Sequence, residues 1–466
     1  MIFLITQLLK PLVGTQLLHA SWSEVPAILK LAFPIILGLT SSTLIGVVDT
    51  IMISPLGTEA LAAASMTTSS LIIMYSSLAG LVSIVNIRMA QGEGANDPHI
   101  VSTTLKNGQV VALISGLIGM VIMVVAFPLI GLLNQPEAVM TVLQPYWLAK
   151  SLMLISNTLL AVYKGFFNAV NRPWTATVLA MFGVLINIPL NYLFIHGLFA
   201  WPGLGLLGAG IASVIASSSA LLLARLLWQY RPNLASYRQP TQFSLSNIQH
   251  RFTEGLPVAL SHAGEGASYA LTGLMLGLFG PTALAANQVV HTIAAIMYMF
   301  PIGMSAAVGI RTGQAIGAQK LNRLRPIGIG ATGMMLSWML YMTAMLVLFR
   351  ETIAGLLTSD PEVFTLAATL FLATAFMQLA DGLQSTALGA LRGMVDVRIP
   401  TIISLTAYWL IALPGAYIAG FVLKFGPNGV WIGYGLGIFL AAFALQIRFW
   451  RRTSAQALSS LRYQKA

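Results

Sequence analysis

The stretch LAFPIILGLTSSTLIGVVDTIMISPLGTEALAAASM, residues 31–66, decides how the rest of the chain is interpreted. It is an apolar run of membrane-spanning length that nevertheless contains a carboxylate, Asp49. Its pattern returns later in the chain, where Pro34 matches Pro257 at an offset of 223. The register then holds without a gap as far as residue 95. The chain is therefore built on an internal repeat.

A second correspondence, at an offset of 225, carries the repeat further, because Pro189 and Gly208 match Pro414 and Gly433. Apolar segments bounded by charge, Gly and Pro are each long enough to cross a hydrocarbon core of about 30 Å. They fall at about 24–50, 60–87, 107–133, 141–165, 173–197, 205–230, 252–279, 283–310, 327–349, 361–390, 400–423 and 428–450.

Composition agrees with a membrane protein. The 466 residues are 57% hydrophobic and 8% charged, whereas soluble domains carry about 25% charged residues. The apolar runs are near-continuous and do not alternate, which favours helices over a β-barrel. We predict an all-α polytopic membrane protein with twelve transmembrane helices in two pseudo-symmetric six-helix lobes, 1–230 and 252–466, joined by a cytoplasmic linker, 231–251. Because six is even, the two repeats have parallel topology.

The net charge of +11 is explained by topology. Nearly all of the 24 Lys and Arg residues fall on one side of the predicted spans, the exceptions being Lys150, Arg350 and Lys424. The positive-inside rule then places both termini in the cytoplasm. We predict that the protein is located in the inner (cytoplasmic) membrane. We predict no nucleic-acid partner. Lys150 is expected to snorkel outward to the interface, the alternative being a pair with a carboxylate.

The residue types also limit the chemistry. There is no cysteine, which excludes disulfides, thiolate metal sites and Cys nucleophiles. The six histidines show no metal-ligand spacing, and no cluster of catalytic residues is visible. We predict that the protein is not an enzyme and needs no cofactor.

Three acidic residues, Asp49, Glu265 and Asp381, stand inside apolar segments of a chain with only 13 Asp and Glu. A carboxylate at the bilayer centre costs roughly 2.5–3.5 kcal/mol on insertion scales, so such residues usually line a water-filled path, bind an ion or relay a proton. The alternative for any single one is a hydrogen bond between helices.

Other polar residues repeat at helical spacing beside these carboxylates, and each set shares one helix face. The faces are Ser261, Glu265, Ser268 and Thr272 on the seventh span, Asn287, Gln288, His291 and Tyr298 on the eighth, Gln378, Asp381 and Gln384 on the tenth, and Asn187 and Asn191 on the fifth as partners of Asp49. We expect the second-half faces to converge on a cavity in which Glu265 and Asp381 form a site for Na⁺ or for a proton. A lone intramembrane His such as His291 is often only a packing residue.

Two further stretches carry a family resemblance. Residues 254–317 contain FPIGMSAAVGIRTGQAIG, and residues 377–401 read MQLADGLQSTALGALRGMVDVRIPT. With residues 31–66, they resemble the multidrug and toxic compound extrusion (MATE) family in its NorM-type branch, at matching spacing over nearly the whole chain. The resemblance implies a V-shaped pair of six-helix lobes and export of cationic, amphipathic drugs by antiport with Na⁺ or H⁺, with Glu265, Asp381 and Asp49 at the family's acidic positions.

One departure from the family pattern stands at Met377, where relatives can have Tyr, so no aromatic side chain is expected beside Asp381 at this position. A flippase for lipid-linked oligosaccharides of the same superfamily is the alternative function, although it would need a cationic groove. An ion channel would need a filter sequence, and the major facilitator class would need a basic loop where QGEGANDPH stands. The sequence does not decide whether the coupling ion is Na⁺ or H⁺, and it does not give the range of drugs. A monomer would suffice for transport.

Overall fold

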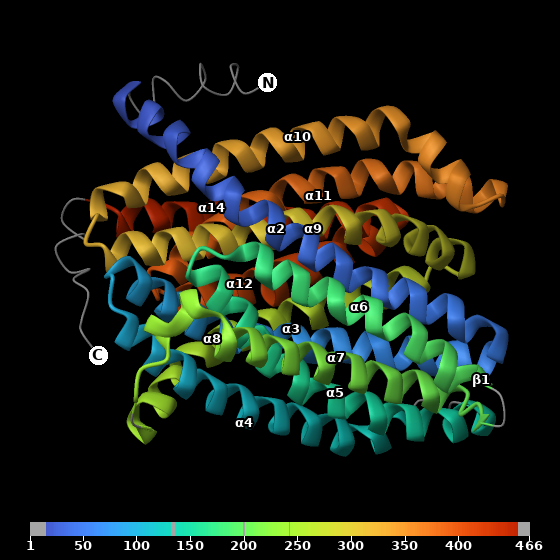
Figure 1. Ribbon diagram of the computed structural model, residues 1–466. Coiled ribbons are helices and arrows are strands. Elements are labelled where there is room, and N and C mark those ends of the chain that lie inside the picture. The colour runs from blue at the N-terminus through green and yellow to red at the C-terminus, as the bar shows by residue number, and fades with distance from the viewer. Residues whose placement is uncertain (1–14, 132–135, 199–200, 242, 455–466) are drawn as a thin grey trace. The chain divides into compact units, whose positions relative to one another are not determined.

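A computed structural model describes residues 15–131, 136–198, 201–241 and 243–454, nearly all of them helical (Figure 1). The predicted cytoplasmic termini, with Lys10, Arg462 and Lys465, lie outside the described residues. The first half comprises α2 (Thr15–Ile53), η1 (Ser54–Leu56), α3 (Thr58–Gly94), α4 (Pro98–Gly131), α5 (Glu137–Ala169), α6 (Pro173–His196), the antiparallel pair β1 (Gly197–Leu198) and β2 (Trp201–Pro202), α7 (Leu206–Tyr230) and η2 (Pro232–Tyr237).

The second half begins with α8 (Leu245–Gly277), α9 (Pro281–Gly317), η3 (Leu321–Arg323), α10 (Leu324–Leu357) and α11 (Pro361–Gly393). The next span is one continuous helix that changes pitch, as α12 (Arg398–Thr406), the π-helical η4 (Ala407–Ala412), α13 (Leu413–Tyr417) and the π-helical η5 (Ile418–Val422), and α14 (Gly426–Arg452) follows. Pro414 lies between the two π segments, where it removes one backbone donor from the helix ladder.

The number of spans agrees with the prediction. Among the described residues, eleven helical segments are long and apolar enough to cross a membrane. The remaining long helix, α8, has 33 residues but carries Arg251, Glu254 and Glu265, which lower its hydropathy. With α8 the helices number twelve, and the predicted all-α polytopic fold is confirmed.

By contact, the helices form two compact units. Unit 1 holds the chain as far as Ile36 and from Leu260 onward, and unit 2 holds Leu37–Ala259. The division cuts α2 after Ile36 and α8 after Ala259, two positions related by the repeat offset of 223. The lobes predicted from the sequence, 1–230 and 252–466, follow whole helices, whereas the contacts assign the first part of α2 to unit 1 and the first part of α8 to unit 2.

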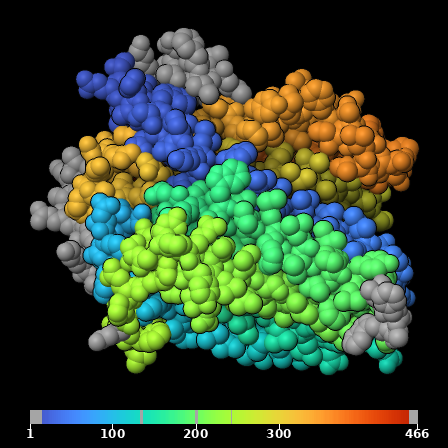
Figure 2. Space-filling model, viewed as in Figure 1, coloured from blue at the N-terminus to red at the C-terminus, as the bar shows by residue number. Residues whose placement is uncertain are grey.

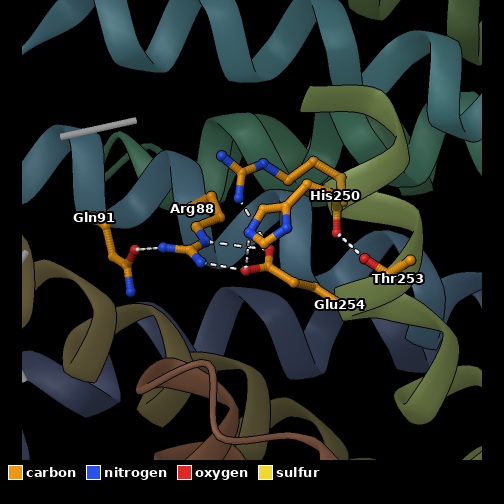
Figure 3. A network of polar contacts seen from close by, with 6 residues as sticks. Arg88, Gln91, His250, Thr253 and Glu254 are labelled. Atoms are coloured by element: carbon orange, nitrogen blue, oxygen red, sulfur yellow. Dashed lines mark hydrogen bonds and ion pairs between the residues drawn. The ribbon is translucent and has the colours of Figure 1, made fainter. Parts of the chain in front are cut away.

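We call residues 15–36 of α2 and 245–259 of α8 the exchanged helix segments, because each belongs by contact to the unit that is formed mainly by the other half of the chain. Ion pairs hold both segments in place. In unit 2, Glu254 of α8 accepts hydrogen bonds from Arg88 of α3 and from Arg251, and His250 lies 3.1 Å from it (Figure 3). Arg88 also donates to Gln91 at 3.1 Å. The carboxylate thus joins α8 to α3 through a guanidinium that contacts both of its oxygens.

Unit 1 contains the matching arrangement. Glu24 of α2 accepts from Arg311 of α9 at 3.0 Å and from Arg323 at 2.6 Å. Arg311 donates to Gln314 at 3.3 Å, as Arg88 does to Gln91, and these two Arg–Gln pairs are related by the repeat. Each unit therefore holds the first segment of an exchanged helix with a glutamate that is largely shielded from solvent, at 7% side-chain exposure for Glu24 and 12% for Glu254.

Each unit has its own apolar core. In unit 2 the core surrounds Trp147, whose indole nitrogen donates to the Met123 carbonyl at 2.8 Å. In unit 1 it surrounds Phe371, Tyr434 and Trp431, all about 1% exposed. The linker between α7 and α8 also makes a polar contact inside unit 2, where the Tyr237 hydroxyl donates to Glu93 at 2.7 Å. Burial raises the pKa of Tyr237, and the Glu93 carboxylate adds to the effect, so the phenol stays a donor.

The outer face of α6 shows how the units present themselves to lipid. Its exposed apolar residues recur every three or four positions, which places them on one stripe of the helix. They are Trp174, Val178, Met181, Leu185, Ile188 and Tyr192. This face belongs to the green surface of unit 2 in Figure 2. A continuous apolar stripe of this length is suited to hydrocarbon.

Repeat-related glycines sit where the backbone needs them. Gly57 and Gly280, which match at the offset of 223, precede α3 and α9 with φ of 105° and 103°. An L side chain is strained in that conformation. Both halves therefore turn into their second helix in the same way.

We expect Gly433→Ala to destabilise the protein by about 1–3 kcal/mol, the usual cost of overpacking. A Cβ at Gly433 would lie 2.2 Å from the backbone oxygen of Gly415, and the repeat-related Gly208 would meet the oxygen of Phe194 at 2.1 Å. The control is Gly273→Ala in α8, where a Cβ meets nothing within 4 Å and helix propensity favours Ala by up to about 1 kcal/mol. Thermal unfolding in detergent measures both, and equal stability of the two variants would contradict the close helix contact.

Candidate functional site

The polar face predicted on the tenth span lies on α11. Asp381 is 9% exposed, and Gln378 and Gln384, three residues before and after it, are 2% and 3% exposed. Residues at that spacing are neighbours on a helix, so the two amides flank the carboxylate. Gln384 donates through Nε2 to the Tyr408 hydroxyl of η4. Within the described part of the chain, the side-chain oxygens of Gln378 and Gln384 have no hydrogen-bond partner.

Glu265 brings a second carboxyl group from α8. The Tyr298 hydroxyl of α9 donates to Glu265 Oε1 at 2.7 Å, and His262 Nδ1 lies 3.9 Å from Oε2. Glu265 is close enough to Asp381 for their charges to interact. It interacts in the same way with Arg392, in the last turn of α11. Helices α8, α9 and α11 thus bring two carboxyl groups and a phenol into one region of unit 1.

The other predicted residues of the eighth span lie on α9 and are held differently. The Asn287 carbonyl oxygen accepts from the Trp431 indole at 3.2 Å. The His291 ring packs against Tyr269, with 5.6 Å between centroids. Gln288 is exposed. Asn287 and His291 therefore contact aromatic rings, and among the described residues neither forms a hydrogen bond or ion pair with a carboxylate.

On α8, Ser261 and Thr272 are buried at 3% and 0% exposure. The Thr272 hydroxyl donates to the Ser268 backbone oxygen at 2.9 Å, and the Ser268 hydroxyl lies 2.8 Å from that of Tyr434 on α14. The hydroxyls of Thr272 and Ser268 are therefore used in contacts within and between helices. Of the predicted lining residues, Tyr298 bonds to Glu265, and Gln378 and Gln384 flank Asp381 on its own helix. Met377 is 3% exposed and belongs to the apolar core of unit 1.

The first-half residues form a separate cluster inside unit 2. Asp49 of α2 accepts from Asn191 Nδ2 at 2.5 Å through Oδ1 and from Lys150 Nζ at 3.0 Å through Oδ2. Asn191 also donates to Asn187 at 3.0 Å, and Lys150 donates to Ser213 of α7 at 2.7 Å. The structure thus brings Asp49, Asn187 and Asn191 together, as the sequence suggested.

The expectation that Lys150 snorkels outward is wrong. Its residue exposure is 6%, and its ammonium points to Asp49 instead of the interface. The reason is local: Tyr146 and Lys150 lie one turn apart on the buried face of α5, and the ammonium is 5.5 Å from the Tyr146 ring. The alternative, a pair with a carboxylate, is the one the structure supports.

Sequence reasoning missed several of the residues that complete these clusters. Ser213 and Tyr408 come from helices with no acidic residue, so nothing local marked them. Arg392, in the last turn of α11, was also not among the predicted site residues. The spacing of Arg392 from Asp381, eleven residues or about three turns on one helix, was the available signal.

The chemistry open to these clusters is ion binding. Carboxylate and amide oxygens are ligands for hard cations, and a carboxyl group can instead carry a proton. In the described ranges, no three of His, Cys, Asp and Glu gather as they would around a multidentate metal ion. The carboxyl groups of unit 1 and the ion pair of unit 2 differ in charge, and Asp381, Asp49 and Lys150 are buried whereas Glu265 is partly exposed.

The internal repeat has a counterpart in a known protein family. A family model described as MatE matches residues 34–193 and again residues 257–418. Together the two matches cover more than half of the chain. The chain belongs to the MatE family. The two matched ranges start 223 residues apart and end 225 residues apart, as the two repeat offsets require.

Similar full-length proteins support the assignment of this MatE chain. It is 32% identical over 446 residues to the probable multidrug resistance protein NorM of Rhodopseudomonas palustris, covering 94% of this chain and 92% of that protein. It is 31% identical to the multidrug resistance protein PmpM of Pseudomonas aeruginosa, covering 92% of each chain. The predicted resemblance to the MATE family in its NorM-type branch is confirmed.

The MatE fold is also found among solved structures. The crystal structure of the eukaryotic MATE transporter AtDTX14 superposes with a TM-score of 0.86 at 20% identity, covering 95% of this chain and all of that one. At 20% identity, this similarity supports the fold alone.

Proposed function

We propose that this MatE chain is a secondary active transporter that exports amphipathic organic cations by antiport with Na⁺ or H⁺. The relatives are named as multidrug resistance proteins. The observation that carries the proposal is the region around Asp381. This buried carboxylate is flanked on its own helix by two amide oxygens that have no hydrogen-bond partner among the described residues, and a second carboxyl group, Glu265, is near it.

In this proposal Asp381 and Glu265 take up the coupling cation, with Gln378 and Gln384 supplying neutral oxygens. Asp49 stays the third candidate. The protein lies in the inner membrane with both termini in the cytoplasm, acts as a monomer and needs no cofactor or enzymatic step.

Coupling follows from a shared conformational equilibrium. External Na⁺ or H⁺ stabilises the state that releases the drug, and a ligand shifts such an equilibrium only by its difference in affinity for the two states. Because coupling is reciprocal in free energy, the cation weakens drug binding by the same factor by which the drug weakens cation binding. The acidic interior suits a positively charged substrate and disfavours an anionic lipid-linked sugar.

The test is efflux of a fluorescent organic cation from proteoliposomes under an imposed Na⁺ gradient or an imposed pH gradient. We expect one of the two gradients to accelerate efflux above the rate without a gradient. Replacing Na⁺ by an impermeant organic cation on both sides is the control for the sodium gradient. If neither gradient drives efflux, the antiport proposal is wrong and the flippase alternative is tested next.

A further inference from the structure

The ion pair of unit 2 gives a carboxylate inside a membrane-spanning helix a counter-charge from the same chain. Asp49 and Lys150 have side-chain exposures of 10% and 7%, and Nζ and Oδ2 are 3.0 Å apart. Uncompensated charge is costly inside a membrane. The pair lowers that cost without any bound ion.

The groups around the pair leave its net charge at zero. Helix α5 contributes Lys150 and Tyr146, α2 contributes Asp49, α6 contributes Asn191 with its neighbour Asn187, and α7 contributes Ser213. Asp49, Lys150 and Tyr146 are the titratable members of this set, and a neutral phenol leaves one negative and one positive charge. The cluster therefore has no net charge and needs no bound cation for neutrality.

The surroundings of Lys150 Nζ resemble those of a small cation. Oxygen atoms of Asp49 and Ser213 lie at 3.0 and 2.7 Å, and the Tyr146 ring lies on another side at 5.5 Å. The ammonium stands where an Na⁺ or a proton on Asp49 would compensate the carboxylate.

The second repeat lacks this device. At the offsets of 223 and 225, Lys150 corresponds to Ala373 and Ala375. Asp49 itself corresponds to Thr272, and Asp381 forms no ion pair with any described residue. A buried lysine therefore compensates Asp49 but not Asp381 in the described part of the chain.

We propose that Lys150 is a tethered cation that keeps Asp49 neutralised, so that the exchangeable Na⁺ or H⁺ is taken up in unit 1 alone. The inference rests on the proposed antiport function and narrows its coupling site to Glu265 and Asp381. Removal of the Lys150 ammonium turns Asp49 into an additional cation site, because its buried carboxylate must then bind Na⁺ or take a proton.

The experiment uses the purified full-length chain in lipid nanodiscs. Equilibrium binding of radioactive sodium is measured per chain, and the infrared band of protonated carboxyl groups is recorded on the same samples. The variants are Lys150→Met, Asp49→Asn/Lys150→Met and Lys150→Arg. We expect Lys150→Met to gain about one cation equivalent per chain, as bound Na⁺ or as a protonated carboxyl group, and the other two to gain none.

No gain in folded Lys150→Met, or a gain that persists in the double variant, overturns the proposal. If Lys150→Met does not fold, Asp49→Asn is measured instead, and a loss of bound Na⁺ relative to wild type overturns the proposal while an unchanged value supports it. These binding measurements do not need transport. A wild-type protein that exports no organic cation would therefore remove the antiport function and still leave the occupancy of Asp49 decided.

Discussion

Asp381→Asn is expected to reduce gradient-driven efflux at least about tenfold while leaving the protein folded. The substitution keeps the shape of the side chain and removes its negative charge. Asp381 forms no ion pair with a described residue, so removal of its negative charge leaves no buried positive charge without a partner. A coupling free energy of about 1–3 kcal/mol corresponds to 5–150-fold, and losing it removes most of the drive.

The efflux assay in proteoliposomes measures this loss, with size-exclusion chromatography as the check on folding. The matched control is Glu351→Gln, which also neutralises one acid but at a side chain that is 69% exposed. Efflux by Glu351→Gln should equal that of wild type. Full gradient-driven efflux by Asp381→Asn would show that the coupling cation is bound elsewhere.

Glu265→Gln should act in the same direction. Its carboxyl group already accepts a hydrogen bond from Tyr298, and an amide oxygen can accept the same bond. A loss of gradient-driven efflux in Glu265→Gln would therefore report the effect of removing the charge, because the hydrogen bond from Tyr298 can be kept.

What the sequence predicted well is what a single helix or a repeat encodes. The polar face of Gln378, Asp381 and Gln384 was visible because side chains three positions apart on one helix are neighbours. The equivalence of the two halves was visible because the repeat keeps its register from residue 34 to residue 95. Hydropathy found even the continuous span that contains Pro414, since its composition does not depend on helix pitch.

What the sequence did not predict depends on contacts between helices. Lys150 and Asp49 are 101 positions apart, and nothing near Lys150 shows that a carboxylate faces it. The same holds for Ser213 and Tyr408, which reach the clusters from α7 and η4. The exchange of helix segments at Ile36 and Ala259 was also hidden, because hydropathy treats α2 as one span whichever unit each part of it packs against.

Glu254→Gln and Glu24→Gln are each expected to lower the stability of the folded protein substantially. Each glutamate is paired with two arginines, and its side chain is 12% or 7% exposed. Removing one partner of a buried ion pair costs about 3–5 kcal/mol, because the remaining charge stays uncompensated. We expect about 3 kcal/mol for each, since Arg88 and Arg323 are partly exposed at 23% and 38%.

Thermal unfolding in detergent measures both losses, with Glu137→Gln as the matched control because Glu137 is exposed in the first turn of α5. The double variant tests whether the two pairs act independently. Each pair lies inside its own compact unit, so the two losses should add within about 0.5 kcal/mol. Unchanged unfolding of either single variant would mean that its ion pair is only a surface contact. The exchanged segment would then have to be held by apolar packing, such as that of Gly255 on the Leu81 backbone in unit 2.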